Sequence, residues 1–149
     1  MTLSGNAAAA QYRKLDTRGN IDDASPHRLI QLMMERVLAK IGVARGHMER
    51  GEIGEKGSNI GDAIEIINGL QASLNHKADA KMSENFDALY DYMMRRLLEA
   101  NLRDDTEVLD EVSGLMQELK EAWDAIADQV ADPAVADPAD APEQTPLQS

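Results

Sequence analysis

The feature that most constrains this chain is a helical repeat of large apolar residues that recurs in four long segments. These residues stand three or four positions apart within each segment, which places them on one face of an α-helix. The breaks between segments, near Gly51, His76 and Asp104, are short, and short connections make successive helices antiparallel. We therefore predict an all-α fold, an antiparallel up-down four-helix bundle. The predicted helices cover residues 26–50, 55–75 and 78–103, followed by a fourth that starts at Asp104 or Asp105, and the bundle occupies residues 25–131.

Capping residues mark the ends of two predicted helices. Ser25 before Pro26 is typical of a helix start, because the Ser hydroxyl accepts a bond from a free backbone N–H and Pro needs no N–H there. Gly51 then favours a helix stop, because glycine adopts the left-handed conformation that often follows a helix. Asp104, with Glu107 three residues later, resembles a capping box at the start of the fourth helix.

The composition agrees with an all-helical chain and excludes several kinds of chemistry. Hydrophobic residues make up 43% of the sequence but aromatic residues only 3%, and the strand formers Val and Thr are sparse. The absence of cysteine excludes disulfides and thiolate catalysis and suits a reducing compartment. No apolar run is long enough to span a bilayer, and no basic and then apolar leader opens the chain. We expect a cytoplasmic protein without membrane contact.

The net charge of −12 belongs to the part of the chain after Arg103. Residues 1–103 carry equal numbers of acidic and basic side chains, whereas Lys120 is the only basic residue that follows. Because no basic stripe is present to neutralise phosphates, the sequence predicts no nucleic-acid partner.

Both ends of the chain are predicted to lie outside the bundle. Residues 1–24 mix alanines, charges and a Gly-Asn pair, and we expect a flexible segment there. Residues 132–149 are rich in Ala, Asp and Gln and contain prolines that prevent a continuing helix, so we expect a disordered acidic tail. The prolines in question are Pro133, Pro138, Pro142 and Pro146.

No pattern of catalytic or metal-binding residues stands out. A di-iron centre in a helical bundle needs Glu-x-x-His pairs, and none of the three histidines follows a Glu at that spacing. There is no Gly-x-Ser-x-Gly nucleophile elbow, and the glycines at Gly54, Gly57 and Gly61 lack the Gly-Lys-Ser/Thr ending of a phosphate loop. We therefore predict no enzyme activity, no metal site and no cofactor.

The third predicted helix is more apolar than one core-facing stripe requires. One stripe comprises Met82, Phe86, Leu89, Met93, Leu97 and Ala100, and a second comprises Tyr90, Met94, Leu98 and Leu102. Two interpretations remain open. The helix contacts two neighbours and uses the wider arc as core, or part of the arc is exposed and receives an amphipathic segment of a partner. On the first helix, Leu32 and Val43 also lie outside the main stripe.

The glycines of the second predicted helix also allow two interpretations. Gly54, Gly57 and Gly61 fall on one strip beside the apolar stripe, and each costs roughly 1 kcal/mol of helix stability relative to Ala. They mark either a frayed helix start or a shallow surface that another backbone can approach closely.

The segment LYDYMMRRLLEANL, residues 89–102, closely resembles the signature of the FliS family, the flagellar export chaperones for flagellin. The resemblance extends to the Ala24-Ser25-Pro26 helix start, the Ile-rich second helix and the closing Trp123, and it covers roughly residues 12–123. The glycine-rich opening of the second helix and the proline-rich tail depart from the family pattern.

The resemblance implies a cytosolic chaperone that binds the disordered C-terminal segment of flagellin, prevents premature polymerisation and assists flagellar type III export. It also implies contact with the export gate and, in some members, with the anti-sigma factor of late flagellar genes. The N-terminal segment, with Tyr12, is expected to lie over the binding surface when no client is present. The runner-up hypothesis is a dimerising structural or signalling bundle.

The candidate partner-binding residues follow from the second stripe and the resemblance together. Met94, Leu98 and Leu102 are expected to line the client groove with Tyr90, while Arg95 and Arg96 form a polar rim and Asn101 caps client or bundle backbone. The complete predicted set is Tyr12, Leu32, Leu89, Tyr90, Tyr92, Met94, Arg96, Leu98, Asn101 and Leu102.

Overall fold

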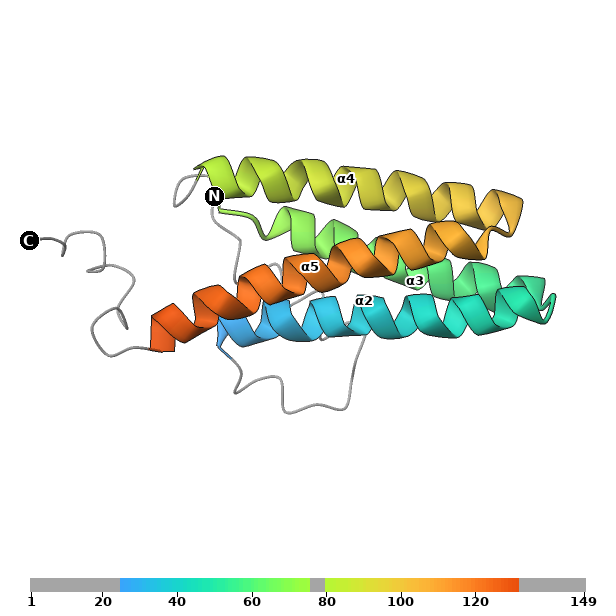
Figure 1. Cartoon of the computed structure of the whole chain (residues 1–149), viewed down its shortest axis with the longest axis horizontal. Helices are drawn as coiled ribbons and strands as arrows, with labels where there is room; N and C mark the ends of the chain where they lie inside the picture. Colours follow the sequence, from blue (N-terminus) through green and yellow to red (C-terminus); the bar gives the residue numbers. More distant parts are fainter. Residues whose placement is uncertain (1–24, 76–79, 132–149) are drawn as a thin grey trace, which may run out of the picture.

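The structure, a computed structural model, describes residues 25–75 and 80–131. This described part contains four α-helices and no strand (Figure 1), so the prediction of an all-α four-helix fold is confirmed. The helices are α2 (Pro26–Glu49), α3 (Ile53–Ala72), α4 (Ala80–Arg103) and α5 (Thr106–Ala131). The predicted flexible N-terminal segment and acidic tail lie outside the described residues.

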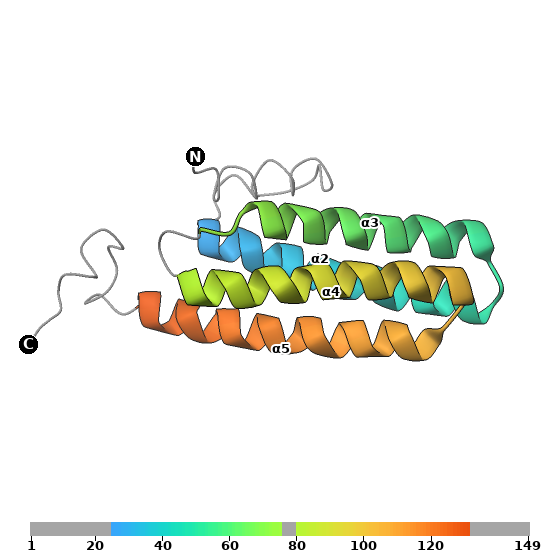
Figure 2. The same ribbon diagram turned by 90° about the horizontal axis from the view of Figure 1, so that it is seen from above.

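The four helices pack side by side as an elongated antiparallel bundle. Each is in contact with two neighbours, α2 with α3 and α5, and α4 with α3 and α5, so the bundle closes on itself between the first and last helix. Figure 2 shows α3 and α5 on opposite sides of the molecule, with α2 and α4 between them. As a result, every helix keeps one face that no other described helix covers, and these faces are available to a partner.

The start and end of α2 follow the residues that the sequence indicates. The Ser25 hydroxyl accepts a hydrogen bond from the backbone N–H of Arg28 at 3.1 Å. At the other end, Gly51 adopts a positive φ of 73°, and the N–H of Glu52 donates to the carbonyl of His47 at 2.9 Å. This left-handed residue with its backward bond is the Schellman motif, which satisfies a carbonyl that the helix leaves free.

The corner between α4 and α5 corrects the predicted capping box. Asp104 is the left-handed residue that ends α4, with φ 53°, and the Asp105 N–H donates to the carbonyl of Ala100 at 3.1 Å. The side chain of Asp105, not Asp104, caps α5 by accepting from the N–H groups of Glu107 at 3.0 Å and Val108 at 3.3 Å. Because Asp104 is used to terminate the preceding helix, the cap moves one residue along.

The core is built from aliphatic and methionine side chains, as the helical repeat predicts. The helical repeat of α2 is buried in full, at Leu29, Met33, Val37, Ile41, Ala44 and Met48. The largest side chains that are completely buried are Tyr90, Met33, Met34, Ile41, Ile60, Ile66, Ile67, Leu70, Met93, Leu97, Leu109 and Met116. Interiors packed this closely respond to the loss of even one methylene group, so these positions carry the stability of the bundle.

Tyr90 occupies a different place from the one predicted. Its side chain is only 1% exposed and its ring meets Phe86 edge to face, with centroids 6.0 Å apart. It therefore belongs to the core and not to an open stripe with Leu98 and Leu102. The reason is geometric, because residues four apart on an α-helix advance by about 40° around its axis. The row that begins at Tyr90 consequently turns from the core toward solvent as it reaches Leu102.

A stacked pair of rings closes the bundle near the start of α2. The rings of His27 and Trp123 lie 4.4 Å apart and are almost parallel, and the Trp123 indole N–H donates to the His27 carbonyl at 3.0 Å. Burial lowers the pKa of His27 below its ordinary value, although the nearby Asp124 carboxylate opposes this shift. The contact ties the first turn of α2 to α5.

Candidate protein-binding surface

Two sets of polar contacts define the two flanks of α4. On the flank toward α3, the Gln71 amide donates to the Asp91 carboxylate at 2.9 Å and to the Asp87 carbonyl at 3.3 Å. On the opposite flank, Arg96 bonds to Glu111 of α5 at 3.0 Å. Helical spacing of three and four residues continues the first flank from Asp91 through positions 94 and 98. Those positions therefore lie along the α3 side of α4.

The α3 flank of α4 becomes increasingly apolar and exposed toward the end of the helix. Met94 is partly buried against the core, whereas Leu98 is 55% exposed and Leu102 is 84% exposed. The antiparallel α3 begins at the same end of the bundle with Ile53, which is 70% exposed. Large apolar side chains exposed together in this way are more typical of interaction surfaces than of an ordinary bundle exterior.

The glycines of α3 continue this surface from the other helix. A Cβ built on Gly57 would lie 3.9 Å from the Asn101 side-chain oxygen, which places Gly57 directly beside the end of α4. A Cβ built on Gly61, one turn further along α3, would meet nothing within 4 Å. We refer to these residues of α3 and α4 together as the seam surface. It comprises Ile53, Gly57, Gly61, Met94, Leu98 and Leu102.

Substituting Gly61 by Ala should stabilise the bundle by about 0.5–1 kcal/mol, because Ala is the better helix former and its methyl group enters open space. The measurement is the midpoint of urea unfolding relative to the parent chain. Gly114→Ala is the matched control, because Gly114 is an exposed glycine of α5 whose added Cβ also meets nothing. A gain from Gly114→Ala without one from Gly61→Ala would indicate that α3 is frayed at this position.

Tyr92 and Arg96 lie on the other flank of α4, where they are joined to α5. The Tyr92 hydroxyl donates to the Glu111 carboxylate at 2.5 Å, and Arg96 bonds to both Glu111 and Glu99. The bond from Tyr92, reinforced by Arg96, holds the pKa of Glu111 below its ordinary value, and the same bond raises the pKa of Tyr92. These two predicted partner-binding residues are thus separated from Leu98 and Leu102 by the width of α4.

The remaining predicted site residues are distributed over the bundle. Leu32 of α2 and Leu89 of α4 are partly buried against the core, and Tyr12 lies outside the described residues. Asn101 is partly buried at the end of α4, and its side-chain oxygen is buried with no hydrogen-bond partner among the described residues. The structure therefore brings together Met94, Leu98 and Leu102, with Asn101 beside them, and leaves the others apart.

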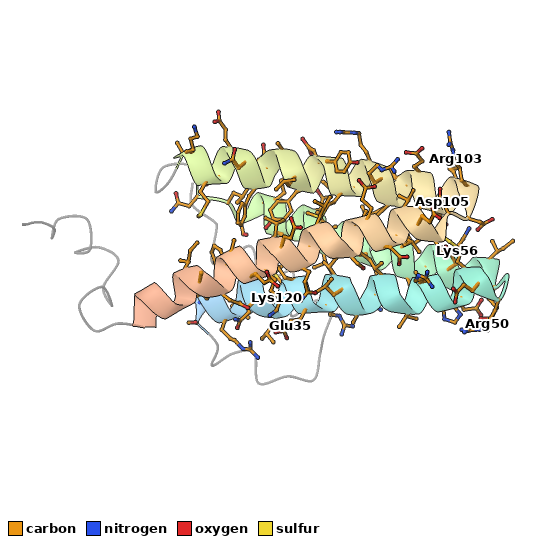
Figure 3. The ribbon with its side chains drawn as sticks, viewed as in Figure 1. Glu35, Arg50, Lys56, Arg103, Asp105 and Lys120 are labelled. Carbon is orange, nitrogen blue, oxygen red and sulfur yellow. The ribbon has the colours of Figure 1, made fainter. Side chains whose placement is uncertain are left out.

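One buried polar residue at the seam surface is missing from the predicted set. Lys56 of α3 is 5% exposed, and its ammonium group donates to the Asn101 carbonyl at 2.9 Å and to the Asp104 carboxylate at 2.6 Å. A signal was present in the sequence, because Lys56 stands four residues before Ile60 and therefore continues the buried stripe of α3. Figure 3 shows Lys56, Arg103 and Asp105 at the same end of the bundle.

The described residues offer few other kinds of site. Among them no group of three or more His, Asp or Glu side chains is arranged to hold a metal ion. Within the same residues, no helix combines the length and apolar character that crossing a bilayer requires. Three of the four large apolar side chains that are exposed in the described residues, Ile53, Leu98 and Leu102, lie at one seam of the bundle. An all-helical bundle with such a surface is typical of proteins that bind other proteins.

Comparison with known proteins places this bundle in a family. The family model described as Flagellar protein FliS matches residues 8–130, which is most of the chain. The chain therefore belongs to the FliS family, and the predicted resemblance to this family is confirmed.

Relatives in several bacteria carry consistent names. The Flagellar secretion chaperone FliSB of Pseudomonas aeruginosa is 48% identical over 120 residues, which is 80% of this chain and 95% of the relative. The Flagellar secretion chaperone FliS of Salmonella typhimurium is 39% identical over 127 residues, covering 85% of this chain and 92% of the relative. That of Bacillus subtilis is 32% identical over 106 residues, covering 71% and 78%.

Proposed function

We propose that this chain is a cytoplasmic, non-catalytic export chaperone that binds the disordered C-terminal segment of flagellin. Binding would prevent premature polymerisation and assist flagellar type III export. The observation that carries the proposal is the exposure of Leu98 and Leu102, which belong to the segment that resembles the FliS signature. Membership of the family and the names of the relatives from Pseudomonas and Salmonella support it.

The physical basis of the proposal is the burial of apolar surface by a client that has no fold of its own. A disordered segment loses conformational entropy when it is ordered on a partner, and burying its apolar stripe offsets that cost. The seam surface supplies exposed leucine and isoleucine side chains for this purpose, and the glycines of α3 leave room for a second backbone. Once covered, the client segment is unavailable for contacts with another flagellin subunit.

Further contacts are proposed on the ground of the resemblance alone. These are the binding of the loaded chaperone to the export gate, the binding of the anti-sigma factor, and the covering of the surface by the N-terminal segment with Tyr12 in the absence of client. The seam surface is the part of the proposal that the described residues support.

The test is a calorimetric titration of the full chain with a peptide of the flagellin C-terminal segment, combined with analytical sedimentation of the free chain. The proposal expects saturable binding with a negative heat-capacity change, the mark of apolar burial. Absence of binding together with a stable dimer would contradict it and favour the dimerising bundle instead.

A further inference from the structure

The first two turns of α3 have little stability of their own. The residue before the helix, Glu52, makes no side-chain capping bond to the free N–H groups, and its carboxylate bonds instead to His47 and Arg50. Three glycines, Gly54, Gly57 and Gly61, follow, and each weakens a helix relative to Ala. A helix start of this composition depends on tertiary contacts to remain formed.

Only two side chains in this stretch of α3 supply buried contacts. Between Ile53 and Gly61, Lys56 and Ile60 are buried, while Ile53, Gly54 and Glu55 are exposed. Ile60 packs into the core one turn further along. The first turn is therefore tethered to the rest of the bundle mainly through Lys56.

The tether reaches the C-terminus of α4 and the corner that follows it. The last carbonyls of an α-helix have no partner within the helix and carry partial negative charge, so an ammonium group is a favourable partner for them. Lys56 donates to one of these carbonyls, at Asn101, and to the carboxylate of the left-handed Asp104. One side chain thus joins the beginning of α3 to the end of α4, which are the two places where the seam surface is most exposed.

We propose that Lys56 is a positioning residue for the seam surface. It holds the weak first turns of α3 beside the end of α4, so that Ile53 and Gly57 form one binding surface with Leu98 and Leu102. The inference rests on the proposed function and names the residue that keeps the binding site assembled. Without the tether, the client would have to order the start of α3 as it bound, and that cost would reduce its affinity.

The test uses the full chain with Lys56→Met. This change keeps an unbranched side chain of similar length and removes the ammonium group. The control is Lys40→Met, because Lys40 also forms an ion pair between helices, with Asp62 at 2.9 Å between α2 and α3, but lies outside the seam surface. Two quantities are measured, the hydrogen-exchange rates of backbone amides 56–61 in the free protein and the affinity for a flagellin C-terminal peptide.

Lys56→Met is expected to accelerate exchange in residues 56–61 and to weaken peptide binding, each by about tenfold, while Lys40→Met changes neither. Unchanged exchange, or unchanged affinity despite faster exchange, would overturn the proposal. If Lys56→Met unfolds the whole bundle, Asp104→Asn takes its place, because Asn tolerates the left-handed conformation but loses the carboxylate. That variant should give the same local pattern with a smaller magnitude, because the bond to Asn101 remains.

Peptide binding by the parent chain and hydrogen exchange in the free protein give separate outcomes. A parent chain that does not bind the peptide overturns the proposed function and with it the role of Lys56 in binding. The exchange comparison needs no peptide and decides independently whether Lys56 holds the start of α3 in place.

Discussion

Leu98→Asp should weaken binding of the flagellin C-terminal segment by at least about tenfold and leave the bundle folded. Leu98 is 55% exposed in the free chain, so its replacement removes little contact with the core. In a complex, full burial of a leucine contributes about 1.5–3 kcal/mol, and each 1.4 kcal/mol is a factor of ten in affinity. A carboxylate in the same place must also lose its hydration, which costs more unless a cation pairs with it.

Calorimetry with the peptide measures the affinity, and circular dichroism measures helical content and the cooperativity of melting. Ala125→Asp is the matched control, because Ala125 is an exposed residue of α5, the helix diagonally opposite α3. It introduces the same charge without touching the seam surface. Loss of cooperative melting in Leu98→Asp would assign Leu98 to the core, and unchanged affinity in a folded variant would remove it from the binding surface.

The fold could be predicted from the sequence because its determinants are local. The spacing of apolar residues defines which face of each helix is buried, and Ser25, Pro26 and Gly51 mark the limits of α2 at their own positions. The residue that caps α5 could not be predicted in the same way, because Asp104 and Asp105 have the same side chain and either could cap a helix. Which of them adopts the left-handed conformation depends on where the hydrogen bonds of α4 end, and this is not visible in the residue types.

The candidate site could be predicted only in part, because contacts between helices decide which of its residues are exposed. Leu98 and Leu102 were expected on a second stripe and are exposed, but Tyr90 of the same row is buried. Tyr92 and Arg96 face α5, since Glu111 lies within hydrogen-bond distance of both. The register of α5 against α4 places Glu111 there, and a single sequence does not specify that register.

Lys56 is a charged residue that the sequence nevertheless places on a buried face. Its position in the apolar repeat of α3 indicated burial, and a buried ammonium group needs acceptors. The acceptors, at Asn101 and Asp104, lie at the end of another helix and are 45 and 48 residues away in the chain. Their proximity follows from the antiparallel pairing of α3 and α4, so the contact could be inferred only after the topology was known.

Tyr90→Ala is expected to have the largest effect on stability, in contrast to Leu98 two turns further along the same helix. The change removes a large side chain that is 1% exposed and leaves a cavity, which costs about 3–5 kcal/mol for an aromatic residue. It also removes the edge-to-face contact with Phe86. Because domains are stable by only about 5–15 kcal/mol, the melting temperature should fall by roughly 10 °C or more.

The contrast with Leu98→Ala makes this prediction specific to the geometry of α4. Leu98→Ala replaces a mainly exposed side chain, and such a substitution should change stability by about 0.5 kcal/mol or less. The measurement is the urea midpoint of both variants, with peptide affinity determined well below the melting temperature of each. Tyr90→Ala should lose mainly stability and Leu98→Ala mainly affinity, because the Tyr90 side chain supports the bundle from within and the Leu98 side chain lies on the proposed binding surface. Equal losses of stability would mean that the row from Tyr90 to Leu102 does not turn from core to solvent, and that the seam surface is part of the core.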